Sequence, residues 1–178
     1  KYALGVTSGT AALVVALKAI GIGSGDKVIV PAVTFLASAG AVVAAGGVPV
    51  FVDVDESLNI NPNDIERVID KYTRAIIAVP ILGNPCKMDE IMNVARKHNL
   101  KVIEDVAQSF GSKYKGQYSG TFGDVGCFSL QMNKTITTGD GGFIVTNDEE
   151  IYERAVRYHD HGMFREREGF LSSLPDNI

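Results

Sequence analysis

The sequence predicts an α/β fold in which a mostly parallel central sheet is flanked by helices. Short runs rich in Val, Ile and Phe alternate with longer runs of helical composition along the 178 residues. With 46% hydrophobic and 21% charged residues, the chain can bury a core of domain size. The pattern shows no internal repeat, so we expect one large domain built on a single sheet.

The first strand and helix pairs are short and rich in small apolar residues. Tyr2–Thr7 is predicted to be a strand, and the alanine- and leucine-rich run Ala11–Ile20 a helix. Lys27–Val30 is the next strand, and Phe35–Ala45 is a second helix that Thr34 is expected to cap. The small side chains of this second helix favour close packing against a sheet.

The middle of the chain repeats the alternation with clear helix signals. Val48–Asp53 is a predicted strand, and Asn61 followed by Pro62 starts a helix that runs to about Lys71. The next three elements are a strand, an amphipathic helix and a strand, namely Arg74–Ile81, Met88–His98 and Leu100–Asp105.

Two predicted buried strands, Val125–Leu130 and Gly142–Thr146, enclose a polar, glycine-rich loop that contains Lys134. A lysine held between buried strands loses hydration, which lowers its pKa and favours the neutral amine that attacks a carbonyl and forms a Schiff base. For this stretch alone, a solvated loop lysine is the alternative. A charged helix, Glu149–Tyr158, then leads out of the sheet.

Charge and composition argue against several classes of function. The formal net charge of -4 offers no basic surface, so no nucleic-acid partner is expected. Gly, Pro or charged residues interrupt every apolar stretch before membrane-spanning length, so we expect a cytoplasmic protein without a membrane partner. Cys86 and Cys127 form no CxxC pair, so we expect reduced, partly buried thiols and no metal site.

Chemically informative residues follow the predicted strands, and ligands of open α/β sheets gather at the strands' carboxyl ends. The segment Ser8 to Thr10 joins a strand to a helix N-terminus, which suits a phosphate, although an ordinary N-cap is the alternative. Phe35 would lie over the same strand ends, unless it is a core residue. Glu104 and Asp105 end a strand and point to opposite sides, so one carboxylate can face the site.

These groups together indicate a site for pyridoxal 5'-phosphate (PLP). A lysine able to form an imine, a phosphate-binding turn, an aromatic ring and an isolated aspartate are the parts that such a site requires. A buried carboxylate needs a partner to stay ionised, and a protonated pyridinium nitrogen would be one. Each feature is weak alone, and their combination in this order is specific.

The motifs resemble those of the DegT/StrS-type sugar aminotransferases, which have the aspartate-aminotransferase-like PLP fold. The resemblance covers nearly all of residues 2–162. It is carried by SGTAAL at 8–13, PAVTF at 31–35, EDVAQ at 104–108, FGDVGCFS at 122–129, and the run that begins with NK at 133–134 and ends with GDGG at 139–142. The family usually has Glu where this chain has Asp140, a change that keeps the charge. A branch with histidine in place of the lysine performs dehydration, so Lys134 favours transamination.

The resemblance implies two catalytic residues. Lys134 would form the Schiff base with PLP and later move the proton between the amine-bearing carbon and the cofactor. Asp105 would keep the pyridinium nitrogen protonated, so that the ring acts as an electron sink. Losing Asp105 should therefore slow the chemistry more than it weakens cofactor binding.

The resemblance also implies a set of cofactor-binding residues besides this pair. Phe35 would stack on one face of the ring, and Gln108 would lie against the ring or its hydroxyl. Gly9, Thr10 and Ser129 would hold the phosphate.

The implied reaction moves an amino group, with glutamate as the donor, to a keto sugar in the synthesis of deoxysugars or cell-surface polysaccharides such as lipopolysaccharide. The acceptor would be a nucleotide-linked keto-deoxysugar or 8-keto-3,8-dideoxy-octulosonate. The segments 133–137 and 158–162 resemble the branch that uses the latter more than the nucleotide-sugar branches. His159 and His161 in the second segment are equally compatible with a solvated helix end.

The resemblance further implies a homodimer and a particular domain organisation. Residues 1–162 would be the large, PLP-binding domain, truncated at its N-terminus, and residues 163–178 the start of the connection to a C-terminal small domain that is missing. The alternative function is a non-catalytic regulatory or interaction protein that retains the fold. A dinucleotide-binding enzyme is disfavoured, because the first strand and helix lack GxGxxG.

Overall fold

A computed structural model describes residues 1–161, and the expected connection at 163–178 lies outside the described residues. A seven-stranded sheet forms the centre of the molecule, in the order β1-β9-β8-β5-β4-β2-β3. Its strands are β1 (Tyr2–Val6), β2 (Lys27–Pro31), β3 (Val48–Val52), β4 (Thr73–Ala78), β5 (Lys101–Asp105), β8 (Val125–Ser129) and β9 (Gly142–Thr146). Strands β8, β5, β4, β2 and β3 pair in parallel, whereas β9 is antiparallel to both neighbours. The predicted fold class is confirmed.

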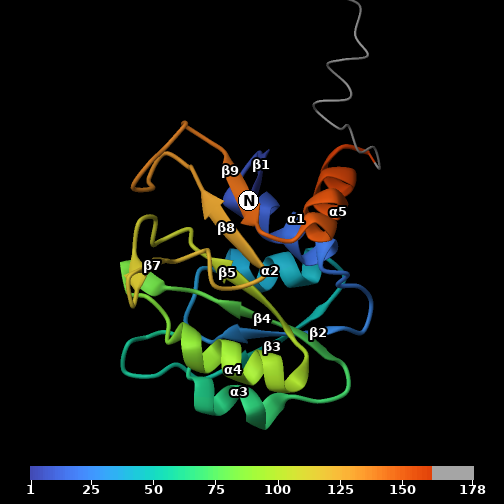
Figure 1. The fold of residues 1–178 in the computed structure, drawn as a ribbon, viewed down its shortest axis with the longest axis vertical. Helices are drawn as coiled ribbons and strands as arrows, with labels where there is room; N and C mark the ends of the chain where they lie inside the picture. Colours follow the sequence, from blue (N-terminus) through green and yellow to red (C-terminus); the bar gives the residue numbers. More distant parts are fainter. Residues whose placement is uncertain (162–178) are drawn as a thin grey trace, which may run out of the picture.

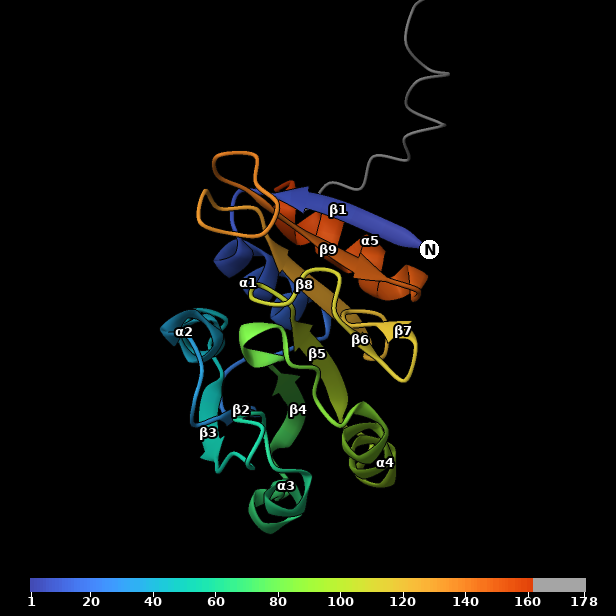
Figure 2. The ribbon, with the colours of Figure 1, turned by 90° about the vertical axis from the view of Figure 1, so that its left-hand side faces the viewer.

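Helices cover both faces of the sheet (Figures 1 and 2). One face carries α1 (Gly9–Ala19), α2 (Leu36–Ala44) and α5 (Glu149–His159), and the other carries α3 (Pro62–Val68) and α4 (Met88–His98). Alternate residues of the strands enter the two cores, so Ile77 and Ile103 belong to the first and Ile76 and Val102 to the second.

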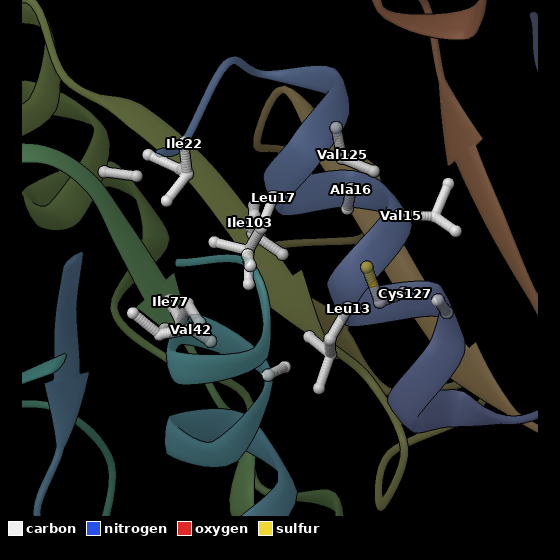
Figure 3. Packing of buried hydrophobic residues seen from close by; sticks show 14 of the residues in the cluster. Leu13, Val15, Ala16, Leu17, Ile22, Val42, Ile77, Ile103, Val125 and Cys127 are labelled. Carbon is white, nitrogen blue, oxygen red and sulfur yellow. The ribbon is translucent and has the colours of Figure 1, made fainter. Parts of the chain in front are cut away.

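The first core is built around α1, whose side chains pack directly on the sheet. Figure 3 shows Leu13 and Leu17 of α1 and Val42 of α2 directed towards Ile77 and Ile103 of the strands. Burying a side chain of this size stabilises the fold by about 1.5–3 kcal/mol. These contacts fix α1 on the sheet and thereby fix the position of its N-terminus.

Two helix ends differ from the sequence prediction. Thr34 does not cap α2, because Phe35 occupies the N-cap position and the Thr34 hydroxyl lies 2.8 Å from the Ser38 hydroxyl instead. Helix α3 ends at Val68 rather than near Lys71. There the Asp70 carboxylate accepts the N–H of Tyr72, and this local turn competes with further helix.

The connections between strands also differ in detail. Strand β4 ends at Ala78, before Pro80, and the predicted extension to Ile81 is instead the start of a single 3-10 turn, η1 (Ile81–Gly83). A small hairpin of β6 (Lys113–Tyr114) and β7 (Gln117–Tyr118) lies between β5 and β8. This hairpin was not predicted from the sequence. In the described part of the chain, no helix is long and apolar enough to cross a membrane.

Candidate active site

A cavity of about 380 Å³ opens at the carboxyl ends of the central strands. Asp105 and Ser129 are the last residues of β5 and β8, so the parallel pairing of these strands brings them to one edge of the sheet. The cavity is lined by Ser8, Gly9, Thr10, Leu13, Phe35, Ala37, Asp105, Ala107, Gln108, Ser129, Gln131, Asn133, Lys134 and Asp140. Its volume is within the usual range for small-molecule sites.

The N-terminus of α1 forms one wall of the cavity. Ser8 is the N-cap, and its hydroxyl accepts the N–H of Ala11 at 3.0 Å. The N–H groups of Gly9 and Thr10 belong to the first turn, where an α-helix has no internal acceptors, and the helix dipole adds partial positive charge. The wall is therefore suited to an anionic group such as a phosphate.

Gly9 packs tightly against Ser129 at the same wall. A Cβ on Gly9 would lie 2.6 Å from the Cβ of Ser129, closer than real Cβ contacts. Glycine therefore lets the helix N-terminus and the end of β8 meet, and it places the Ser129 hydroxyl beside the free N–H groups.

Asp105 lies at the bottom of the site, with 5% of its surface exposed. Its Oδ2 accepts a hydrogen bond from the Ser38 hydroxyl at 2.7 Å, and its Oδ1 accepts one from the Ala107 N–H at 3.2 Å. Burial raises the pKa of Asp105, whereas the hydrogen bonds from Ser38 and Ala107 and the charge of Lys134 act in the opposite direction. An added cationic partner would favour the ionised carboxylate.

Glu104 points to the opposite face of the sheet, as strand alternation predicts. Its carboxylate accepts three backbone N–H groups, from Gly120, Phe122 and Gly123, at 2.7–2.8 Å. The Glu104 carboxylate is thus bound by backbone N–H groups, and Asp105 is the carboxylate that faces the cavity.

Lys134 is half-buried in a loop that its own hydrogen bonds keep compact. The carbonyl of Gln131 accepts the Lys134 N–H at 2.9 Å, and the side-chain oxygen of Gln131 accepts the N–H of Asn133 at 2.8 Å. Leu130 closes the base of the loop through backbone bonds to Thr138 and Gly141. The loop therefore presents Lys134 to the cavity from a defined turn.

Phe35 and Gln108 line the same cavity from other elements. The Phe35 side chain is 68% exposed, so its ring is not part of the core. Gln108 is half-buried, and its side-chain oxygen accepts the N–H of Leu82 at 3.3 Å.

All seven predicted site residues line this single cavity, and their roles stay predictions. They are Gly9, Thr10, Phe35, Asp105, Gln108, Ser129 and Lys134. Gln131 also lines the cavity but was not assigned from the sequence, although its position between a buried strand and Lys134 was a usable signal. Asp140 also lines the cavity, and its side chain accepts the Gly141 N–H within its own loop.

No cysteine or histidine among residues 1–161 lines the cavity. Cys86 and Cys127 are free and buried, and burial raises the pKa of both thiols far above the ordinary value. Both are more deeply buried than the sequence analysis expected, since each is 1% exposed. Among residues 1–161, no cluster of three potential metal ligands occurs.

Comparisons with known proteins identify the family of the chain. The sequence profile of the DegT/DnrJ/EryC1/StrS aminotransferase family matches residues 1–174. A GDP-perosamine synthase of Escherichia coli O157:H7 is 49% identical over 164 residues, which cover 92% of this chain and 45% of that protein. The chain spans about 45% of the length of this curated relative.

Solved structures give the same result. An aminotransferase from Psychrobacter cryohalolentis superposes with a TM-score of 0.89 at 49% identity, covering 91% of this chain and 42% of that one. NtdA from Bacillus subtilis, solved with its bound cofactor PMP, superposes with a TM-score of 0.83 at 36% identity, covering 89% and 36%. The chain therefore belongs to the DegT/DnrJ/EryC1/StrS aminotransferase family.

Proposed function

We propose that this chain is the cofactor-binding part of a PLP-dependent aminotransferase that moves an amino group from glutamate to a keto sugar. The observation that carries the proposal is the one cavity shared by a half-buried lysine, a buried aspartate and the N-terminus of α1. The structure of NtdA with bound PMP supports a cofactor of this class. A cytoplasmic homodimer is part of the proposal.

The residues present fit PLP in both charge and shape. The N–H groups at the start of α1 and the Ser129 hydroxyl would hold the phosphate, because they are donors in the positive field of a helix N-terminus. Asp105 would accept a hydrogen bond from the protonated ring nitrogen, which supplies the cationic partner that a buried carboxylate needs. Phe35 would cover one face of the ring with its exposed side chain.

Two residues of the chain would move or hold protons during the reaction. The cofactor, when bound, supplies an electron sink for the electron pair that remains when a proton leaves the carbon bearing the amine. The Lys134 amine, from its turn beside the cavity, would take that proton from the carbon and deliver it to the cofactor. Asp105 would keep the ring nitrogen protonated throughout. The reaction has two halves, in which glutamate gives up its amino group and the keto sugar receives it.

A nucleotide-linked keto-deoxysugar is the proposed acceptor. The GDP-perosamine synthase that is 49% identical to this chain is named for a nucleotide sugar, which favours this acceptor over 8-keto-3,8-dideoxy-octulosonate. The pathway would be deoxysugar or cell-surface polysaccharide synthesis, lipopolysaccharide included.

Covalent trapping tests the proposal. The full-length protein is incubated with PLP, reduced with borohydride and digested, and the peptides are weighed by mass spectrometry. The peptide that contains Lys134 should gain the mass of the reduced cofactor, because only a lysine joined to the carbonyl carbon is fixed by reduction. Amino transfer from glutamate to a nucleotide-linked keto sugar is then measured with the same preparation.

Two variants control this experiment. Lys134→Arg keeps the positive charge but removes the nucleophilic amine, so it should lose both the label and amino transfer. Lys71→Arg changes an exposed lysine that does not line the cavity and should keep both. A full-length protein without label at Lys134 would overturn the enzyme proposal and favour a non-catalytic regulatory or interaction protein with this fold.

A further inference from the structure

Three polar side chains form a row that runs from the loop before α2 to the carboxylate of Asp105. The Thr34 and Ser38 hydroxyl oxygens are 2.8 Å apart, and the Ser38 hydroxyl donates to Asp105 Oδ2 at 2.7 Å. Ser38 is fully buried within α2, at 0% exposure, and Thr34 is half-buried. The row joins residues that are 67 positions apart in the chain.

The proton count fixes the direction of this row. A serine hydroxyl has one proton to donate, and Ser38 gives its proton to the Asp105 carboxylate, which is acceptor-only when ionised. Ser38 can therefore only accept from Thr34, so the donors run from Thr34 to Ser38 to Asp105. Hydrogen bonds that point the same way polarise one another, and the bond to a charged acceptor is the strongest member.

We propose that Ser38 is a positioning residue for Asp105, and that Thr34 supports it by donating to the same hydroxyl. The bond from Ser38 occupies one lone pair of Oδ2, and the Ala107 N–H occupies one of Oδ1. The carboxylate is thereby held against rotation, and each oxygen keeps acceptor capacity towards the cavity. The role of this orientation in amino transfer rests on the proposed function.

The location of Thr34 gives the row a second consequence. Thr34 directly precedes Phe35, which lines the cavity and forms the N-cap of α2. The row therefore ties the start of the loop segment that carries Phe35 to the residue at the bottom of the site. The two hydroxyl groups thereby connect the segment of Phe35, which would cover one ring face, with Asp105, which would bind the ring nitrogen.

A titration of Asp105 in the cofactor-free, full-length protein tests the proposal directly. Aspartate side chains are labelled with carbon-13 at the carboxyl group, and the Asp105 signal is assigned from its loss in Asp105→Asn. Ser38→Ala should move the titration midpoint of Asp105 upwards, because the ionised carboxylate loses a donor. Thr34→Val should move it in the same direction by less, and Thr34→Ser, which keeps the hydroxyl, should match the wild type.

Other groups near Asp105 are unchanged in these variants. Among the described residues, two titratable groups interact electrostatically with Asp105: Lys134 in the loop after β8 and Cys127 on β8. Glu104 points to the other face of the sheet. Ala is a good helix former and smaller than Ser, so Ser38→Ala should fold normally. Thermal unfolding of each variant checks this.

The outcomes separate the possibilities. An unchanged Asp105 midpoint in a folded Ser38→Ala protein would overturn the proposal. If Ser38→Ala does not fold, equal midpoints for Thr34→Val and Thr34→Ser would overturn it. A Thr34→Val shift as large as that of Ser38→Ala would overturn the assigned order of donors. The titration needs no cofactor, so these results stand apart from the labelling of Lys134 that tests the proposed function.

The cofactor-loaded protein provides a second measurement. Ser38→Ala should lower kcat by roughly ten-fold, which corresponds to the loss of one hydrogen bond to a charged group, while KM for the keto sugar stays within about two-fold. With nitrogen-15 PLP, the ring-nitrogen signal should move towards that of unprotonated pyridine in Ser38→Ala. A lower kcat without any change in this signal would indicate a structural role only and contradict the positioning role.

Discussion

Asp105 is a residue whose burial is unfavourable in the cofactor-free protein. Burial raises its pKa above the ordinary value of 3.8, so the folded protein takes up this proton more readily than the unfolded chain does. The protonated Asp105 therefore makes its full contribution to the free energy of unfolding below about pH 3.8. This contribution is lost as the pH rises through the raised pKa of the folded state. Once the carboxylate is ionised, the hydrogen bonds from Ser38 and Ala107 and the charge of Lys134 compensate the cost of its burial only in part.

Asp105→Asn should make the cofactor-free protein more stable at pH 7. Asn keeps the size of the side chain but never ionises, so the free energy of unfolding should rise by about 1 kcal/mol. Chemical denaturation at pH 7 and pH 4 checks this, because the difference should shrink at pH 4. The same variant should lose amino transfer. A variant that is less stable than the wild type at pH 7 would contradict this account of Asp105.

Site residues at strand ends can be predicted from the sequence, whereas a supporting residue inside a helix cannot. Asp105 and Ser129 end buried strands and Lys134 lies in the loop after one, and strand ends of a parallel sheet meet at one edge. Ser38 lies within a run of small helical residues, where a serine carries no local signal. Its partner is 67 residues away, so only the packing of α2 on the sheet shows the contact.

At the scale of elements, the loop before β8 is held by a carboxylate from the neighbouring strand. Glu104 of β5 pairs in register with Gly126 of β8, and its side chain accepts the N–H groups of Gly120, Phe122 and Gly123. A Cβ on Gly126 would lie 2.2 Å from the Gly120 carbonyl oxygen, so the loop packs directly on the strand. This contact places the strand whose end carries Ser129.

Glu104→Gln should therefore destabilise the protein, in contrast to Asp105→Asn. The amide keeps one acceptor oxygen, but its NH₂ group faces a backbone donor, so about 2 kcal/mol of unfolding free energy should be lost. Urea denaturation measures the loss, and hydrogen exchange should become faster at the amides of Gly120, Phe122 and Gly123. Glu56→Gln, at an exposed turn position, is the control. Equal stability of Glu104→Gln and the control would show that the Glu104 carboxylate does not hold the loop before β8.

The element boundaries show which sequence signals were sufficient. Asn61 and Pro62 start α3 as predicted, because a cap and a proline act within one turn. The predictions for the end of α3 and for a cap at Thr34 were wrong. The Thr34 hydroxyl contacts the Ser38 hydroxyl and does not cap the helix, and the Asp70 N–H donates to the Thr73 hydroxyl in a turn after α3. The β6–β7 hairpin was missed because each strand has only two residues, too few for a periodic pattern.

At the scale of the whole molecule, two large exposed apolar side chains are sequence neighbours of residues that line the cavity. Leu36 is 80% exposed and directly follows Phe35, and Met132 is 68% exposed between the cavity residues Gln131 and Asn133. Exposed apolar side chains gathered at one site mark a surface that another chain or domain covers. The proposed homodimer would bury them and close the cavity from solvent.

Leu36→Glu should weaken the dimer of the full-length protein. A charge placed in an apolar interface must be desolvated, so the dimer dissociation constant should rise at least about ten-fold. Val48→Glu is the control, because Val48 starts β3 at the opposite, amino-terminal end of the parallel strands and is 45% exposed. Sedimentation over a range of protein concentrations measures both. A dimer equally stable in Leu36→Glu and Val48→Glu would show that the partner subunit does not cover this surface.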